Sequence, residues 1–336
     1  MANRYGTEGN DTIDGTFVDD IIGAYGGNDI LRGFQGNDLI FAGADDDWMD
    51  GGAGADTLYG LSGFDTASYE SATSGVVVRL DGNACQNGVA QGDRLYDVEK
   101  LIGSSFGDQL HGADSVADTL LGGNGDDTVF GSTGADDLRG GGGVDMLSYL
   151  LSDAGVTVNL ATNAASGGDA QGDTIGGFER LSGSGFADTL VGSGADNLLF
   201  SAGGNDTVRG GGGKDIIAGG TGRDLLWGGA AGDEFIYSSE QDSGTTAATR
   251  DVLNDFSRNQ GDKIRIDIHD PIGTPGFPAP LEFIGQGAFS AERQVRFVHQ
   301  NGDTIVQVNV SGDGGAELAI ELNGIVNLQA ADFILG

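Results

Sequence analysis

The sequence predicts an all-β solenoid built from short glycine-rich repeats. Aspartates recur every nine residues, seven times in succession, at Asp11, Asp20, Asp29, Asp38, Asp47, Asp56 and Asp65. An apolar residue follows each of them two positions later, from Ile13 to Ala67, and the 64 glycines follow the same period. No apolar pattern keeps the 3.6-residue period of an amphipathic helix. Each unit can bury only one side chain, so the units must stack to form a core.

The units approximate G-G-x-G-x-D-x-U-x, where U is a large apolar residue. The aspartate ladder returns in two further blocks, at Asp108, Asp118, Asp127, Asp136 and Asp145, and at Asp188, Asn197, Asp206, Asp215, Asp224 and Asp233. The step from Asp108 to Asp118 is ten residues, so we expect the additional residue to bulge out of a turn. Asn197 replaces an aspartate, and we expect it to weaken one site.

Two inserts interrupt the repeats and are related by a shift of 80 residues. The shift aligns Tyr69 with Tyr149, and Ala90–Asp93 with Ala170–Asp173. Apolar residues at 76, 78 and 80 alternate as in a one-sided strand. We therefore interpret the inserts as longer solenoid coils with surface loops. The predicted solenoid domain covers residues 1–236, with repeat blocks 6–68, 103–148 and 183–236 and inserts 69–102 and 149–182.

Residues 237–336 have a different composition and are predicted to form a β-rich cap. Five segments alternate like strands, at 251–256, 262–267, 294–298, 304–310 and 317–322. All four prolines fall between Pro271 and Pro280 and predict a rigid surface connection. The stretch from Asn309 to Glu317 has offsets similar to a D-x-D-x-D-G calcium loop, but a hairpin turn fits it better.

The formal net charge is −35, from 51 acidic and 16 basic side chains. No basic stripe is available to bind phosphates, so a nucleic-acid partner is excluded. The sequence contains no apolar run of the roughly 18 residues that a membrane span needs, and no apolar segment of an N-terminal signal peptide. The single cysteine, Cys85, cannot form an intramolecular disulfide. We interpret it as a small loop residue, with a reactive thiol or a disulfide-linked dimer as the alternatives.

The ladder indicates calcium. Ca²⁺ takes 6–8 oxygen ligands from carboxylates and carbonyls, and glycine-rich turns expose carbonyls. No His or Cys recurs with the repeat, which disfavours zinc and copper, and Mg²⁺ prefers a stricter geometry. The predicted ligands are the side chains of Asp11, Asp20, Asp29, Asp38, Asp47, Asp56, Asp65, Asp108, Asp118, Asp127, Asp136, Asp145, Asp188, Asn197, Asp206, Asp215, Asp224 and Asp233, and the carbonyls of Gly27, Gly36, Gly54, Gly125, Gly134, Gly204, Gly213 and Gly222.

The nonapeptides resemble RTX, or hemolysin-type, calcium-binding repeats over about two-thirds of the chain. The resemblance implies a parallel β-roll in which six residues form a calcium-binding turn, three form a strand, and one coil takes eighteen residues. Stacked strands lie about 4.8 Å apart, so ions could sit between aspartates eighteen residues apart. The pairs are 11–29, 20–38, 29–47, 38–56, 47–65, 118–136, 127–145, 188–206, 197–215, 206–224 and 215–233, which predicts roughly eleven ions.

The chain from about Gly228 to its end resembles the C-terminal region of serralysin-type secreted proteins. The similarity lies in GGAAGDEFIY, in DVLNDF followed by GDKIRID, in NGDTIVQVNVSGDGGAEL and in Asp332–Leu335. It implies that the C-terminal acidic residue and the apolar residues after it belong to a signal read by a type I secretion machine. An ordinary last strand is the alternative.

No catalytic site is predicted. Serralysins use an HExxH zinc site, and His111, His269 and His299 lack that spacing. The G-x-S-x-G string at 103–107 lies in repeat register and not in a strand–turn–helix. The repeats begin at Gly6, which favours a complete protein without an upstream catalytic domain.

We predict a secreted, extracellular protein that folds on binding calcium and has a structural role or binds cell surfaces or polysaccharide. The alternative is the export and folding module of a secreted protease or polysaccharide-modifying enzyme.

Overall fold

The structure is a computed structural model that describes residues 2–268 and 280–336. The predicted proline-rich connection, apart from Pro280, and His269 lie outside the described residues. The only helices in the described part are the short 3₁₀ turns η1 (Gly88–Ala90), η2 (Gly168–Ala170) and η3 (Ala330–Asp332). The chain divides into two compact units, residues 1–149 with 163–180, and residues 150–162 with 181–336.

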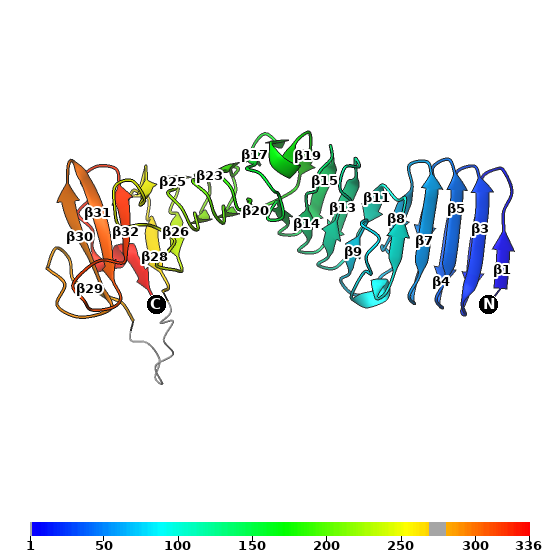
Figure 1. The fold of residues 1–336 in the computed structure, drawn as a ribbon, viewed down its shortest axis with the longest axis horizontal. Coiled ribbons are helices and arrows are strands. Elements are labelled where there is room, and N and C mark those ends of the chain that lie inside the picture. Colours follow the sequence, from blue (N-terminus) through cyan, green and yellow to red (C-terminus); the bar gives the residue numbers. More distant parts are fainter. Residues whose placement is uncertain (1, 269–279) are drawn as a thin grey trace. The chain divides into compact units, whose positions relative to one another are not determined.

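The first unit is a roll of parallel strands, stacked coil after coil from the N-terminus in the blue to green part of the ribbon (Figure 1). One sheet contains β1 (Ala2–Tyr5), β3 (Asp20–Gly26), β5 (Leu39–Ala44), β7 (Thr57–Ser62) and β10 (Arg94–Tyr96). A second contains β2 (Thr12–Thr16), β4 (Ile30–Phe34), β6 (Trp48–Asp50), β8 (Thr66–Ser68), β11 (Lys100–Ile102), β13 (Thr119–Asn124), β15 (Asp137–Gly142), β19 (Thr174–Gly176) and the antiparallel β18 (Ala164–Ser166). A third contains β9 (Val77–Arg79), β12 (Gln109–His111), β14 (Thr128–Phe130) and β16 (Met146–Ser148).

The second unit repeats this design. One sheet contains β17 (Thr157–Asn159), β21 (Thr189–Val191), β23 (Thr207–Gly212), β25 (Leu225–Ala230), β27 (Asp251–Leu253), β32 (Leu318–Leu322), β31 (Asp303–Asn309), β30 (Gln294–Gln300) and β29 (Glu282–Phe283). The other contains β20 (Arg180–Ser182), β22 (Leu198–Phe200), β24 (Ile216–Ala218), β26 (Glu234–Tyr237), β28 (Lys263–Ile266) and β33 (Phe333–Leu335). Both sheets therefore continue past Tyr237 into the C-terminal segment.

Strand register follows the repeat. Ile22 pairs with Ile40 and Leu31 pairs with Met49, so each coil takes eighteen residues. The apolar residue two positions after each aspartate points inward and is buried, and the strand residues on either side of it are more exposed. Each unit thus contributes one core side chain, as the sequence predicts. The fold-class prediction of an all-β parallel roll with longer inserts is confirmed.

The ten-residue step from Asp108 to Asp118 places its additional residue in a turn, as predicted. Across it, the backbone N–H of Asp108 bonds the carboxylate of Asp127, nineteen residues away instead of eighteen. The additional residue lies in the turn 112–118, where Ser115 has a φ of +66° and its N–H donates to the Thr133 carbonyl. The strands on both sides keep their register.

A substitution at Gly54 tests how closely the turns of successive coils pack against each other. It has a φ of +153°, and a β-carbon there would collide with the Gly36 carbonyl of the preceding coil. We expect Gly54→Ala to lower the free energy of unfolding in calcium by more than about 1 kcal/mol. The matched control is Gly185→Ala, because a β-carbon on Gly185 meets nothing within 4 Å. Denaturant titration compares the two, and equal stabilities would contradict the stacking argument.

Candidate functional site

The repeat acids form hydrogen-bonded ladders between coils. The backbone N–H of Asp29 donates to Oδ1 of Asp47 at 2.8 Å, and that of Asp38 donates to Oδ1 of Asp56 at 2.8 Å. The same bond joins Asp11 to Asp29, Asp20 to Asp38, Asp47 to Asp65, Asp118 to Asp136, Asp127 to Asp145, Asp188 to Asp206, Asn197 to Asp215, Asp206 to Asp224 and Asp215 to Asp233. Every predicted side-chain ligand except Asp11 is buried. The structure thus brings all the predicted acids together in pairs.

Six acids outside the repeats end these ladders, and repeat spacing alone missed them. Asp93 and Glu99 accept the N–H groups of Asp56 and Asp65, both at 2.8 Å. Asp173, Glu179, Asp251 and Asp262 do the same for Asp136, Asp145, Asp224 and Asp233. The 80-residue duplication could have revealed four of them, because it aligns Asp93 with Asp173 and Glu99 with Glu179.

In seven turns, which we call closed turns, the second residue of the unit bonds the acid of the same unit. The Thr16 N–H and hydroxyl donate to Oδ2 of Asp20 at 2.6 and 2.7 Å. The closed turns end at Asp11, Asp20, Asp108, Asp118, Asp136, Asp188 and Asn197. Six of them have Thr or Ser at the second position; the exception, Ala113, offers Asp118 only its N–H and leaves Oδ1 unpaired.

In eleven turns, which we call open turns, the second and fourth residues both have positive φ. The Oδ2 of the aspartate is then buried without a hydrogen-bond partner in the described part of the chain. The open turns end at Asp29, Asp38, Asp47, Asp56, Asp65, Asp127, Asp145, Asp206, Asp215, Asp224 and Asp233. Tyr25, Phe34, Leu61 and Ala202 adopt this conformation without being glycine, at φ of +72° to +78°. Such residues cost about 1–3 kcal/mol each and are typical of functional sites.

Backbone oxygens converge on the unpaired carboxylates. A β-carbon on Gly33 would collide both with Oδ2 of Asp38 and with the Gly51 carbonyl of the next coil. Gly210 has the same surroundings, made by Asp215 and the Gly228 carbonyl. Among the described residues, no three His, Cys, Asp or Glu side chains group around one point as in a zinc site. Carbonyls with a few carboxylates are instead the donor set of a hard cation, so these residues fit calcium.

The predicted carbonyl donors divide in the same way. Seven of them stand at the fourth position of open turns, with φ between +95° and +153°: Gly27, Gly36, Gly54, Gly125, Gly204, Gly213 and Gly222. Gly134 belongs to the closed turn that ends at Asp136, where the Ser132 hydroxyl donates to the carboxylate. Sequence reasoning treated all turns alike, although a Thr or Ser at the second position marks six of the seven closed turns and none of the open ones.

Burial changes the acidity of the open-turn carboxyls. It raises the pKa of Asp38 to about 6, of Asp47 to about 7 and of Asp224 to about 8. Neighbouring aspartates add to each of these shifts. Charged carboxylates in this layer therefore need a counter-charge, and a bound cation would supply it.

Buried tyrosines take the place of a cation where two ladders end. The Tyr69 hydroxyl donates to Oδ2 of Asp93 at 3.0 Å, and the Tyr149 hydroxyl donates to Oδ2 of Asp173 at 2.7 Å. Each tyrosine follows the last aspartate of its block by four residues, and Tyr237 follows Asp233 in the same way. These two ladders thus end on a carboxylate whose second oxygen accepts a hydrogen bond from the protein.

The remaining sequence features have structural roles. Burial raises the pKa of the Cys85 thiol to about 11, so the reactive-thiol alternative is disfavoured. His111 stacks on Phe130 with ring centres 4.0 Å apart. The 103–107 string is a closed turn, in which Ser104 bonds Asp108. In the hairpin between β31 and β32, Val310 donates to Glu317, which supports the hairpin interpretation.

Comparison with protein families agrees with this geometry. Residues 5–33, 32–67, 113–147 and 173–208 match the RTX calcium-binding nonapeptide repeat, in four copies. This chain is an RTX calcium-binding repeat protein. Residues 208–335 of the RTX protein match the family described as peptidase M10 serralysin C terminal. Neither match is to a catalytic domain.

Solved structures similar to the RTX protein include two subunits of the mannuronan C5-epimerase of Azotobacter vinelandii. AlgE6R3 is 26% identical, with 45% of this chain and 79% of that one covered and a TM-score of 0.33. AlgE6R2 is 27% identical, with 46% and 90% covered and a TM-score of 0.34. The extracellular lipase LipA of Serratia marcescens is 17% identical, with 70% and 40% covered and a TM-score of 0.27. The comparison with curated proteins returned no match. Among the described residues, no helix is long and apolar enough to span a membrane.

Without calcium, stability should depend on pH through the open turns. Burial raises the pKa of open-turn carboxyls, to about 6 for Asp38, about 7 for Asp47 and about 8 for Asp224, so their protonated forms favour the folded state. Stability is then present at low pH and is lost as pH rises between about 4 and about 8. In excess chelator, we expect more β signal by circular dichroism at pH 5.5 than at pH 8, and calcium should abolish most of the difference. A chelated sample with more β structure at pH 8 would contradict this assignment.

Proposed function

We propose that this protein leaves the cell unfolded through a type I secretion machine and folds outside by binding calcium in its open turns. Once folded, it has a structural role or binds cell surfaces or polysaccharide, and it is not an enzyme. One observation carries the proposal: the eleven aspartates of the open turns each bury an Oδ2 atom that no group in the described chain satisfies. A buried ionised carboxylate without a partner costs several kcal/mol, so the folded state needs a cation there.

The open and closed turns suggest which pairs hold ions. Six pairs join two open turns: 29–47, 38–56, 47–65, 127–145, 206–224 and 215–233. The other five include a closed turn, in which protein donors already occupy one acid: 11–29, 20–38, 118–136, 188–206 and 197–215. We propose the first six as the strongest calcium sites. This divides the roughly eleven predicted sites into two classes.

Charge and mass action favour this mechanism. The formal net charge of −35 opposes compaction until cations neutralise the buried acids. Extracellular calcium modules bind at about 10⁻⁴–10⁻³ M, so they fill outside the cell. Each ion that binds only the folded state adds RT ln(1 + [Ca²⁺]/Kd) to its stability, and the contributions of several sites add up.

The C-terminus supports export before folding. The final strand β33 pairs with β28, Phe333 is buried, and Asp332 forms a salt bridge with Arg258 at 2.6 Å. A secretion signal in these residues would be accessible only in the unfolded chain. Folding that waits for extracellular calcium keeps the signal exposed during transport.

Calcium addition tests the mechanism directly. We expect the purified chain to show little β signal by circular dichroism in excess chelator at pH 7.5, and a full β spectrum at millimolar calcium, because binding energy becomes folding energy. Magnesium at the same concentration serves as the control and should give less structure. Equal spectra in chelator and in calcium would contradict the proposal.

A matched pair of variants tests the two classes of turn. Asp47 lies in two open pairs, whereas Asp20 lies in a closed turn. Asp47→Asn keeps an oxygen for the ladder bond, as Asn197 keeps the Ser193 bonds in its closed turn, but it removes charge from the open layer. We expect Asp47→Asn to raise the calcium midpoint of folding at least about threefold and Asp20→Asn to change it less than twofold. Equal shifts in a calcium titration would refute the division.

A further inference from the structure

A row of aromatic rings crosses the outer face of the first sheet and lacks one ring. Tyr5, Phe41, Tyr59 and Tyr96 stand on β1, β5, β7 and β10, in register across the sheet. Phe41 and Tyr59 stack at 5.1 Å with an interplanar angle of 8°, and Tyr59 and Tyr96 stack at 4.9 Å with an angle of 15°. Between Tyr5 and Phe41, the position on β3 is Gly23.

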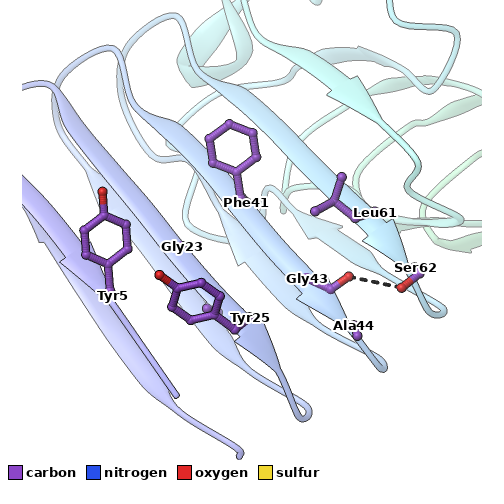
Figure 2. Close-up of a pocket in the computed structure, with 9 residues that line it drawn as sticks. Tyr5, Gly23, Tyr25, Phe41, Gly43, Ala44, Leu61 and Ser62 are labelled. Carbon is purple, nitrogen blue, oxygen red and sulfur yellow. Dashed lines mark hydrogen bonds between the residues drawn. The ribbon is translucent and has the colours of Figure 1, made fainter. Parts of the chain in front are cut away.

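The missing ring leaves a notch of defined width. Neighbouring strands lie about 4.8 Å apart, so Tyr5 and Phe41 are separated by two strand spacings, which is room for one ring between them. Figure 2 shows both side chains standing on either side of the bare backbone at Gly23. In the next row, Gly43 lies between Tyr25 and Leu61. The two notches form one cavity of about 470 Å³.

The chemistry of the cavity selects a neutral ligand. None of its nine lining residues is charged, although the chain has a formal net charge of −35. Tyr5 and Tyr25 are more than half exposed and present hydroxyl groups, and Ser62 adds a third hydroxyl (Figure 2). Pockets of this kind hold ligands by apolar stacking and use a few polar groups for orientation.

A pyranose ring matches these features, because it has flat C–H faces and a polar hydroxyl edge. We propose that the cavity binds a hexopyranose residue of a neutral glycan, with its ring between Tyr5 and Phe41 over Gly23. The proposal rests on the proposed function in one respect: calcium must fold the roll before the notch exists. An acidic glycan is disfavoured because no cationic side chain lines the cavity.

Gly23 provides a sharp test of the notch. Its backbone is not in the left-handed region, and a β-carbon there would meet the Tyr5 ring at 3.4 Å, an ordinary contact. Gly23→Tyr therefore places the missing ring in the notch and continues the stacked row. Gly43 is unsuitable for this test, because its φ is +128° and a β-carbon would collide with the Tyr25 carbonyl.

Isothermal titration calorimetry of the full chain in millimolar calcium tests the proposal. The probes are cellohexaose, laminarihexaose, maltohexaose and mannohexaose. We expect at least one of these neutral oligosaccharides to bind. Gly23→Tyr and Phe41→Ala should each weaken that binding more than about tenfold, which is about 1.4 kcal/mol. Tyr96→Ala, at the far end of the row, should change it less than about twofold, and trigalacturonate should not bind.

Three results would overturn the proposal: no binding of any neutral oligosaccharide, binding that Gly23→Tyr leaves unchanged, or displacement by a tryptophan-containing peptide in preference to the sugars. Circular dichroism of the same samples separates this inference from the calcium-folding proposal. A folded chain without glycan binding contradicts the notch alone, whereas a chain that does not respond to calcium contradicts the folding proposal.

Discussion

The roll depends on one constraint, which is that every buried carboxylate needs partners for both of its oxygens. The first oxygen is satisfied in the same way along each ladder, by the backbone N–H of the preceding coil, as between Asp29 and Asp47. The second oxygen has three solutions. A Thr or Ser at the second repeat position bonds it in most closed turns, and a tyrosine hydroxyl bonds it in Asp93 and Asp173. In open turns the described chain offers it no partner, and a cation takes that role in the mechanism proposed above.

These solutions are not scattered along the chain. The first coil of each repeat block has closed turns on both sides: 6–11 and 15–20, 103–108 and 112–118, and 183–188 and 192–197. Most later turns of each block are open, and the coil after the first block ends in a tyrosine-bonded aspartate. Each block therefore begins with a coil whose acids are bonded within their own turns, apart from Oδ1 of Asp118. This coil presents N–H groups in register for the carboxylates of the next coil.

The sequence predicted the fold because the period of nine determines both the core and the ladder. Ile22, Leu31 and Ile40 are buried where the repeat places them. It did not predict the open and closed turns, because aspartate and glycine define the repeat, whereas the hydroxyl of a residue such as Thr16 decides the state of the turn. The repeat pattern could not predict the pairing of β33 with β28 either, because these strands lie far apart in the chain. The predicted C-terminal strands do match β27, β28, β30, β31 and β32 in position.

Shared ligands make the open turns interdependent. Asp47 belongs to two open pairs, because it accepts the N–H of Asp29 while its own N–H donates to Asp65. A cation that fixes the turn ending at Asp47 thereby positions a ligand for the neighbouring pair along the same side of the roll. In the proposed mechanism, left-handed residues such as Tyr25 and Leu61 oppose folding until that cation binds. Backbone strain and unpaired charge make folding of the calcium-free coils unfavourable. Because neighbouring sites share a ligand, an ion bound at one site favours binding at the next. Calcium binding and folding along each ladder should therefore be cooperative.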